Sequence, residues 1–196
     1  MIMSELQFTA FEESGKKNTE ETLNLAKKNA DALGIKKIVI ASTTGFTIEK
    51  AIDVFDPEKY ELICVTHNYG FKEGIEQEFP DDKLMEMRKK GVCFVTGTLA
   101  FSGVQSHLPK KFNCWDMSGM FARLLRSTIG DGVKVVMEMS LMACDAGMVK
   151  VGEDLIAIAG TGSGADTCAL IKASSTRLFT DLKIKAILAK PYVGRW

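Results

Sequence analysis

The sequence predicts an α/β protein in which helices cover both faces of a mostly parallel β-sheet, in a three-layer α/β/α arrangement. Short, nearly all-apolar runs alternate with longer segments whose apolar residues recur at helical spacing. The apolar runs lack polar alternation, which is typical of strands that are buried on both faces. Because a domain takes roughly 150 residues, the 196-residue chain is expected to form one domain over residues 1–196.

The first half of the chain predicts a βαβ unit preceded by a helix. Asn18 or Thr19 caps this first helix, and Gly34 ends it. The next strand is Lys37–Ala41, and an amphipathic segment separates it from a second strand, Glu61–Thr66. A connection of this kind is right-handed and makes its two strands parallel.

The third unit repeats the same plan. A short helix is expected from Asp81 or Asp82 through Lys90, and the strand Val92–Thr96 follows it. Beyond the loop after this strand we expect a further loop that contains Pro109.

The last third predicts two helices and then only extended segments. Asp116 caps a helix with an apolar stripe, and Val133–Ala146 forms a second helix that is apolar on almost every side. The extended segments are Asp154–Ala159, Thr167–Ala173 and Lys183–Ala189. Since no helix separates them, they should add an antiparallel edge to the sheet. With strands numbered from the first βαβ unit, the expected order is 3-2-1-4-5.

Composition and charge exclude several classes of partner and location. Lys and Arg number 25, as do Asp and Glu, so the net charge is zero. Neither nucleic acid nor a membrane is therefore expected as a partner. The five cysteines have no Cys-x-x-Cys spacing, so we interpret them as buried, reduced thiols and expect no metal site. The N-terminal segment lacks the basic start and apolar stretch of a signal peptide, which favours a cytoplasmic protein.

Four loops are expected at the carboxyl edge of the sheet, where ligands of open α/β proteins bind. They are Ser42–Thr47, Thr66–Phe71, Gly97–Gly103 and Gly160–Asp166. The first loop has hydroxyl groups, a glycine and a following helix N-terminus, which together favour a bound phosphate without any lysine. The alternative is that these residues only cap the helix.

The other loops carry weaker signals. Gly160–Asp166 has the spacing G-x-G-x-G and precedes a strand, so it does not match the dinucleotide-binding motif. It is either a backbone loop against a ligand, with Asp166 as a hydrogen-bond acceptor, or a tight cluster of turns. His67 is a candidate polar group of the pocket, although a loop histidine in solvent is the simpler interpretation.

The order of these elements, with the segments KIVIASTTGFT, THNYGF and AGTGSGADT, resembles the C-terminal α/β domain of pyruvate kinase. It is more similar still to small, mostly archaeal proteins that consist of that domain alone. The resemblance runs from about Phe11 onward and implies a pyruvate kinase C-terminal domain-like fold. In allosteric pyruvate kinases the matching loop cradles one phosphate of a sugar bisphosphate. Kinase activity is not implied, because the catalytic barrel domain has no counterpart here.

The position of Phe46 is frequently basic in the kinases, so the resemblance favours a ligand with one phosphate and an aromatic body, with flavin mononucleotide (FMN) as the best candidate cofactor. The expected binding residues are Ser42, Thr43, Thr44, Gly45, Phe46, Thr47, Thr66, His67, Asn68, Gly97, Phe101, Gly160, Thr161, Gly162, Ser163, Gly164, Ala165 and Asp166. A regulatory module that senses a phosphorylated sugar or nucleotide, and a small flavin-dependent oxidoreductase, are the alternatives. No catalytic residue is assigned. The apolar helices between Met117 and Met148 suggest a homo-oligomer, although an ordinary core explains them equally well.

Overall fold

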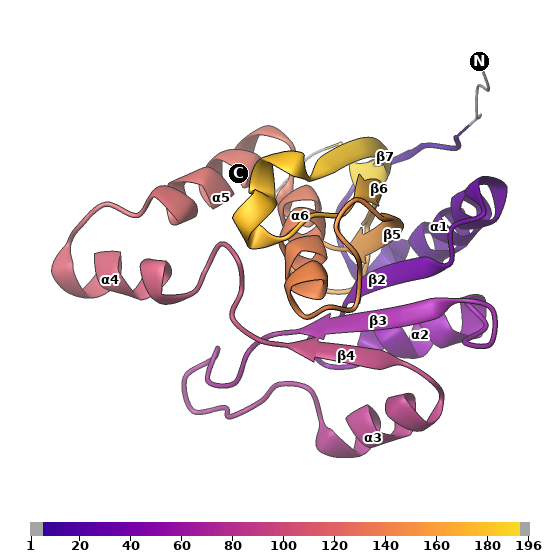
Figure 1. Cartoon of the computed structure of the whole chain (residues 1–196), viewed down its shortest axis with the longest axis horizontal. Coiled ribbons are helices and arrows are strands. Elements are labelled where there is room, and N and C mark those ends of the chain that lie inside the picture. Colours follow the sequence, from indigo (N-terminus) through magenta and orange to yellow (C-terminus); the bar gives the residue numbers. More distant parts are fainter. Residues whose placement is uncertain (1–5, 193–196) are drawn as a thin grey trace.

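A computed structural model describes residues 6–192 of the chain, as strands of one sheet with helices packed on both faces (Figure 1). The elements in chain order are β1 (Thr9–Phe11), the short 3-10 helix η1 (Lys16–Asn18), α1 (Thr19–Leu33), β2 (Lys37–Ala41), α2 (Phe46–Val54), β3 (Glu61–Thr66), α3 (Asp81–Lys89), β4 (Cys93–Thr96), α4 (Val104–Phe112), α5 (Met117–Thr128), α6 (Asp131–Asp145), β5 (Asp154–Ala159), β6 (Thr167–Lys172), η2 (Thr176–Asp181) and β7 (Lys183–Pro191). None of the described helices is both long enough and apolar enough to cross a membrane.

The sheet has seven strands in the order β1-β7-β6-β5-β2-β3-β4. The strands β2, β3, β4 and β5 pair in parallel, and β6 is antiparallel to both β5 and β7. The α/β class, the mostly parallel sheet and the antiparallel pairing near one edge agree with the sequence prediction. The observed order differs from the expected 3-2-1-4-5, because the sheet continues beyond β6 with β7 and β1. The strand β1 has only three residues, too few to show a period in the sequence.

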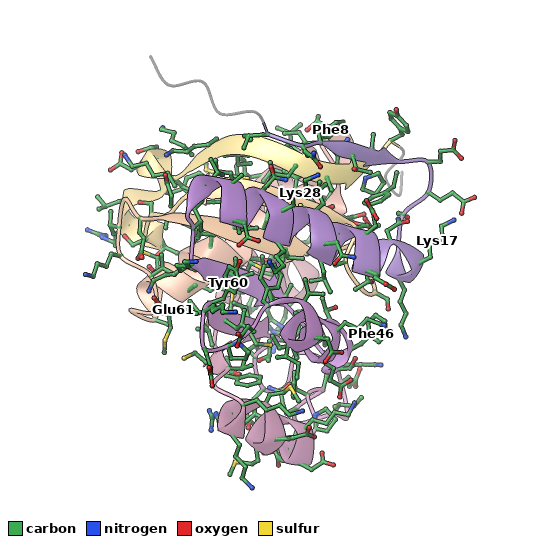
Figure 2. All side chains as sticks on the ribbon, turned by 90° about the vertical axis from the view of Figure 1, so that its right-hand side faces the viewer. Phe8, Lys17, Lys28, Phe46, Tyr60 and Glu61 are labelled. Carbon is green, nitrogen blue, oxygen red and sulfur yellow. The ribbon has the colours of Figure 1, made fainter. Side chains whose placement is uncertain are left out.

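The residues of β2 alternate between two cores on opposite faces of the sheet. Ile38 and Ile40 pack in the core on the side of α1 and α2. Val39 packs in the core on the side of α6. Figure 2 views the molecule from the side that α1 and α2 cover. The helices α2 and α6 therefore lie on opposite faces and approach each other only around the edge of the sheet.

The register of the sheet brings three predicted loops together. Ala41 at the end of β2 pairs with Val65 of β3, and Ile40 pairs with Ile158 of β5. The next residue, Ser42, donates its backbone N–H to the carbonyl of Val65 at 3.1 Å. The segments that follow β2, β3 and β5 thus leave the sheet side by side, as parallel strands require.

One prediction about the segment between β4 and α6 was wrong. The expected loop around Pro109 is the helix α4, which contains the proline in its interior. The helix expected after Asp116 is observed as α5, and its apolar stripe is divided: Met117 and Met120 are exposed, whereas Phe121 packs at the core. A proline does not always end a helix, and a broad apolar stripe does not show which of its residues become buried. Tertiary packing decides both.

Candidate functional site

A cavity of about 560 Å³ lies at the carboxyl edge of the sheet. It is lined by the ends of β2 and β3, the start of α2, the bend after β5, and one side of α6. The predicted residues that line it are Ser42, Thr43, Thr44, Phe46, Thr47, Thr66, His67, Gly160, Gly162, Ser163 and Gly164. The predicted residues outside this lining are Gly45, Asn68, Gly97, Phe101, Thr161, Ala165 and Asp166.

The loop between β2 and α2 presents backbone donors to the cavity. Among the described residues, no acceptor takes the N–H of Phe46 or of Thr47, the first two residues of α2. The N–H of Ile48 donates weakly to Ser42 Oγ, at 3.4 Å. Ser42 thus partly caps the helix, which was the alternative to a phosphate site. The amides of Phe46 and Thr47 nevertheless remain available to a ligand.

Gly45 allows the backbone conformation of this loop. Its φ of +95° is in the left-handed region, where residues with a side chain are strained. A Cβ at this position would also lie 3.2 Å from Lys83 Cδ and 3.5 Å from Phe79 Cζ. Gly45 therefore orients the first turn of α2 and does not itself line the cavity.

The bend between β5 and β6 is held by Asp166, which is fully buried. One carboxylate oxygen accepts the N–H of Gly15 at 2.8 Å and that of Thr161 at 3.1 Å, and the other accepts the hydroxyl of Thr167 at 2.8 Å. Both carboxylate oxygens of Asp166 therefore accept hydrogen bonds from groups of the protein itself. Asp166 thus positions the bend and joins it to the N-terminal segment.

The glycines of the bend allow it to pack closely against that segment. A Cβ at Gly164 would lie 2.5 Å from Thr19 Oγ1 and 2.6 Å from Lys16 Cα. A Cβ at Gly160 would lie 2.3 Å from the carbonyl oxygen of Gly164. Among the described residues, no acceptor takes the backbone N–H groups of the tip, residues 162–164. The G-x-G-x-G spacing thus marks a tight turn that also exposes backbone donors to the cavity.

His67 is held at the rim of the cavity by groups that the sequence did not point to. Its Nδ1 lies 2.7 Å from Glu78 Oε2, and the ring stacks on Phe71 with 3.9 Å between the ring centroids. Only 32% of the side chain is exposed. His67 is thus a loop residue that is partly exposed and partly covered, because Glu78, eleven residues further along the chain, folds back against it.

An ion pair on α6 is the main feature of the cavity that was not predicted from the sequence. Lys134 and Glu138 are 2% and 4% exposed, and Lys134 Nζ bonds to Glu138 Oε2. The other oxygen of Glu138 accepts the N–H of Phe101 at 2.8 Å and the hydroxyl of Ser102 at 3.3 Å. Burial lowers the pKa of the Lys134 amine from its usual value, and Glu138 opposes that shift. Both residues line the cavity.

A signal for this pair was present in the sequence. Lys134 and Glu138 interrupt an otherwise apolar helix and are four residues apart, so they share one of its faces. Lys and Glu are almost never fully buried unless they are paired, so opposite charges at this spacing on an apolar helix are consistent with a buried ion pair.

Basic groups also lie in the lining of the cavity and beside Phe46. Arg126 and Asp131 form an ion pair there, with 3.3 Å between Nε and Oδ1. Lys16 Nζ lies 3.8 Å from the centroid of the Phe46 ring, and Lys50 Nζ lies 5.6 Å from it. Figure 2 shows Phe46 where α2 begins, at the same end of the helical layer as the neighbouring Lys17. Two lysine ammonium groups thus lie near Phe46 at the start of α2, where the free backbone amides also lie.

No model of a known protein family matches the chain. Within residues 6–192, no three His, Cys, Asp or Glu side chains gather where they could hold a metal ion. The functional argument therefore depends on the shape, the hydrogen-bonding groups and the charges of this cavity.

Proposed function

We propose that the protein binds a small molecule with one phosphate group and a planar body, and that FMN is the best candidate. The observation that carries this proposal is that the free amides at the start of α2 open into a cavity of about 560 Å³. Pockets for small molecules range from roughly 300 to 1,000 Å³, so the cavity has a suitable size.

The phosphate end of the ligand would lie against the first turn of α2. Free N–H groups and the positive end of the helix dipole favour an anion at this position. The hydroxyls of Thr43 and Thr47 line the same part of the cavity and can donate to phosphate oxygens. Lys16 and Lys50 add positive charge beside the ring of Phe46, which belongs to the lining. The resemblance of this loop to the phosphate-binding loop of pyruvate kinase supports the same placement.

The planar body would lie between α6 and the bend after β5. Apolar side chains of Val65, Leu99, Met139 and Met142 line this region, and sulfur-containing side chains pack well against aromatic rings. The bend at residues 160–164 supplies backbone amides that can bind ring oxygen or nitrogen atoms. An aromatic heterocycle with polar edges, such as the flavin ring, suits this combination of surfaces.

Titration of the purified protein with FMN, followed by flavin fluorescence, tests the proposal, with riboflavin as the matched ligand that lacks the phosphate. We expect FMN to bind at least tenfold more tightly than riboflavin, because a hydrogen bond to a charged group contributes about 1.5–3 kcal/mol. Replacing Thr43→Val and Thr47→Val together should weaken FMN binding by tenfold or more and leave riboflavin binding unchanged.

The control variant is Thr180→Val, which removes the same hydroxyl from an exposed position outside the cavity. It should bind FMN like the wild type. Equal affinity for FMN and riboflavin would show that the start of α2 does not hold the phosphate. Absence of any FMN binding, together with release of a co-purified sugar phosphate or nucleotide when the protein is denatured, would favour the sensing module instead.

A further inference from the structure

Burial of the Lys134–Glu138 pair has a desolvation free energy that the attraction between the two charges does not clearly offset. Removing two charges from water costs several kcal/mol for each ion, and a pair of apolar residues of the same size is often at least as stabilising. The pair nevertheless lies on α6, where almost every other residue is apolar and buried. Such a pair at the wall of a cavity points to a role in binding.

The contacts of the pair orient the lysine rather than neutralise it completely. Both oxygens of Glu138 are engaged, one by Lys134 and the other by Phe101 N–H and Ser102 Oγ. An ammonium group has three donors, and Glu138 is the one acceptor that the described residues provide for Lys134. The ring of Phe101, whose centroid lies 5.6 Å from Nζ, packs on another side. Lys134 thus retains donors for a group that enters the cavity.

The position of the pair defines how a ligand would lie. The helix α2 covers one face of the sheet and α6 covers the other, and both line the cavity at the end of β2. A ligand that places its phosphate at the start of α2 therefore passes around the end of β2 before it reaches Lys134. The free amides at the start of α2 and the ammonium group of Lys134 would therefore bind opposite ends of the same ligand.

We propose that Lys134, oriented by Glu138, donates to a carbonyl or anionic oxygen at the end of the ligand remote from its phosphate. This inference rests on the proposed function and narrows its substrate class to phosphate esters with an acceptor-rich planar head. In FMN the acceptor group is the pair of carbonyl oxygens of the flavin ring. A simple sugar phosphate, whose remote end carries hydroxyl groups, makes a weaker partner for a buried ammonium group.

The variant that tests this inference is the double substitution Lys134→Met with Glu138→Gln. Methionine keeps much of the length and volume of the lysine stem. Glutamine keeps an oxygen for the N–H of Phe101 and the hydroxyl of Ser102, so neither charge is left alone. A second neutral pair, Lys134→Gln with Glu138→Gln, preserves a polar contact within α6 in case the first pair unfolds. Cooperative thermal unfolding establishes that each variant is folded.

We expect either neutral pair to weaken the binding of FMN and of riboflavin by the same factor, tenfold or more. The ratio of the two affinities should stay at the wild-type value, because the phosphate end is unchanged. The Thr43→Val and Thr47→Val variant should show the opposite pattern, with a loss confined to FMN. Lys134→Arg keeps the charge and its pairing with Glu138, and should bind FMN within a few-fold of the wild type.

The possible failures of the two proposals are distinguishable. If the wild type binds FMN and the folded neutral pairs bind it equally well, Lys134 has no role in binding and the inference is overturned while the proposed function stands. If only the FMN-to-riboflavin ratio falls in the neutral pairs, Lys134 contacts the phosphate, which also overturns it. If the wild type binds neither FMN nor riboflavin, the proposed function fails and the inference fails with it.

Discussion

Individual residues at the cavity could be predicted when their role depends on local chain geometry. Ser42 and Thr47 were expected at the phosphate end because a hydroxyl-rich loop between a strand and a helix implies free amides. Lys134 and Glu78 were missed, because their importance depends on partners that only the fold brings near. Asp166 was expected to bind a ligand, whereas its carboxylate bonds to backbone and hydroxyl groups within the protein.

The cysteines differ from the expectation that all five are buried. Cys64, Cys144 and Cys168 are buried, whereas Cys93 and Cys114 are exposed. Burial raises the pKa of the Cys64 and Cys144 thiols and raises that of Cys168 to about 12. A raised pKa leaves less of the reactive thiolate at neutral pH.

A thiol-reactive disulfide such as 5,5′-dithiobis(2-nitrobenzoate) should therefore modify two thiols of the native protein rapidly. The other three should react only slowly, and all five should react rapidly in concentrated urea. The absorbance of the released thiolate measures both the number and the rate. In the variant Cys93→Ser with Cys114→Ser the fast phase should disappear, and a fast phase that remains would contradict the burial of the other three.

At the scale of elements, the prediction succeeded where periodicity was long and failed where segments were short or interrupted. The helices α1 and α6 have strong apolar patterns and clear end signals, so they were predicted near their observed bounds. The strand β1 and the helix α4 were missed, because three residues show no period and a proline in α4 argued against a helix. Neither β1 nor α4 could be predicted without knowledge of the packing around it.

The start of α6 is fixed by a close contact with β6. A Cβ at Gly132 would lie 2.0 Å from Thr167 Oγ1 and 2.5 Å from Thr167 Cβ. In most helices a change from glycine to alanine is favourable, by up to about 1 kcal/mol. Here the added methyl group would displace Thr167, whose hydroxyl donates to Asp166.

Gly132→Ala should therefore lower the free energy of unfolding, by roughly 1–3 kcal/mol as for other overpacked sites. Urea unfolding followed by circular dichroism measures the change. Gly97→Ala is the matched control, because no atom lies within 4 Å of a Cβ at that position and its φ is not positive. It should raise the free energy of unfolding by no more than about 1 kcal/mol. A stabilising effect of Gly132→Ala would show that α6 packs less closely on β6 than the structure indicates.

For the whole molecule, the cavity lies where the two helical layers meet around the end of β2. Its lining joins α2 from one layer to α6 from the other, and the segments after β3 and β5 complete it. The sequence predicted that these segments share one edge, since parallel strands place their carboxyl ends together. It did not predict that α6 lines the cavity, because the spacing of Lys134 and Glu138 places them on one helix face without showing which loops that face will meet. The expected homo-oligomer stays a prediction.

A ligand that contacts both layers should stabilise the folded protein as a unit, because it binds only when both are in place. At an FMN concentration one hundred times its dissociation constant, this linkage contributes about 2.7 kcal/mol. For a domain of this size each kcal/mol raises the unfolding temperature by roughly 2–4 °C, so a shift on the order of 5–10 °C is expected. Differential scanning calorimetry with FMN measures the shift. Riboflavin at the same concentration should give at most about half of this shift, because tenfold weaker binding reduces the linkage to about 1.4 kcal/mol. Two separate unfolding transitions, with only one of them moved by FMN, would show that the ligand contacts a single layer.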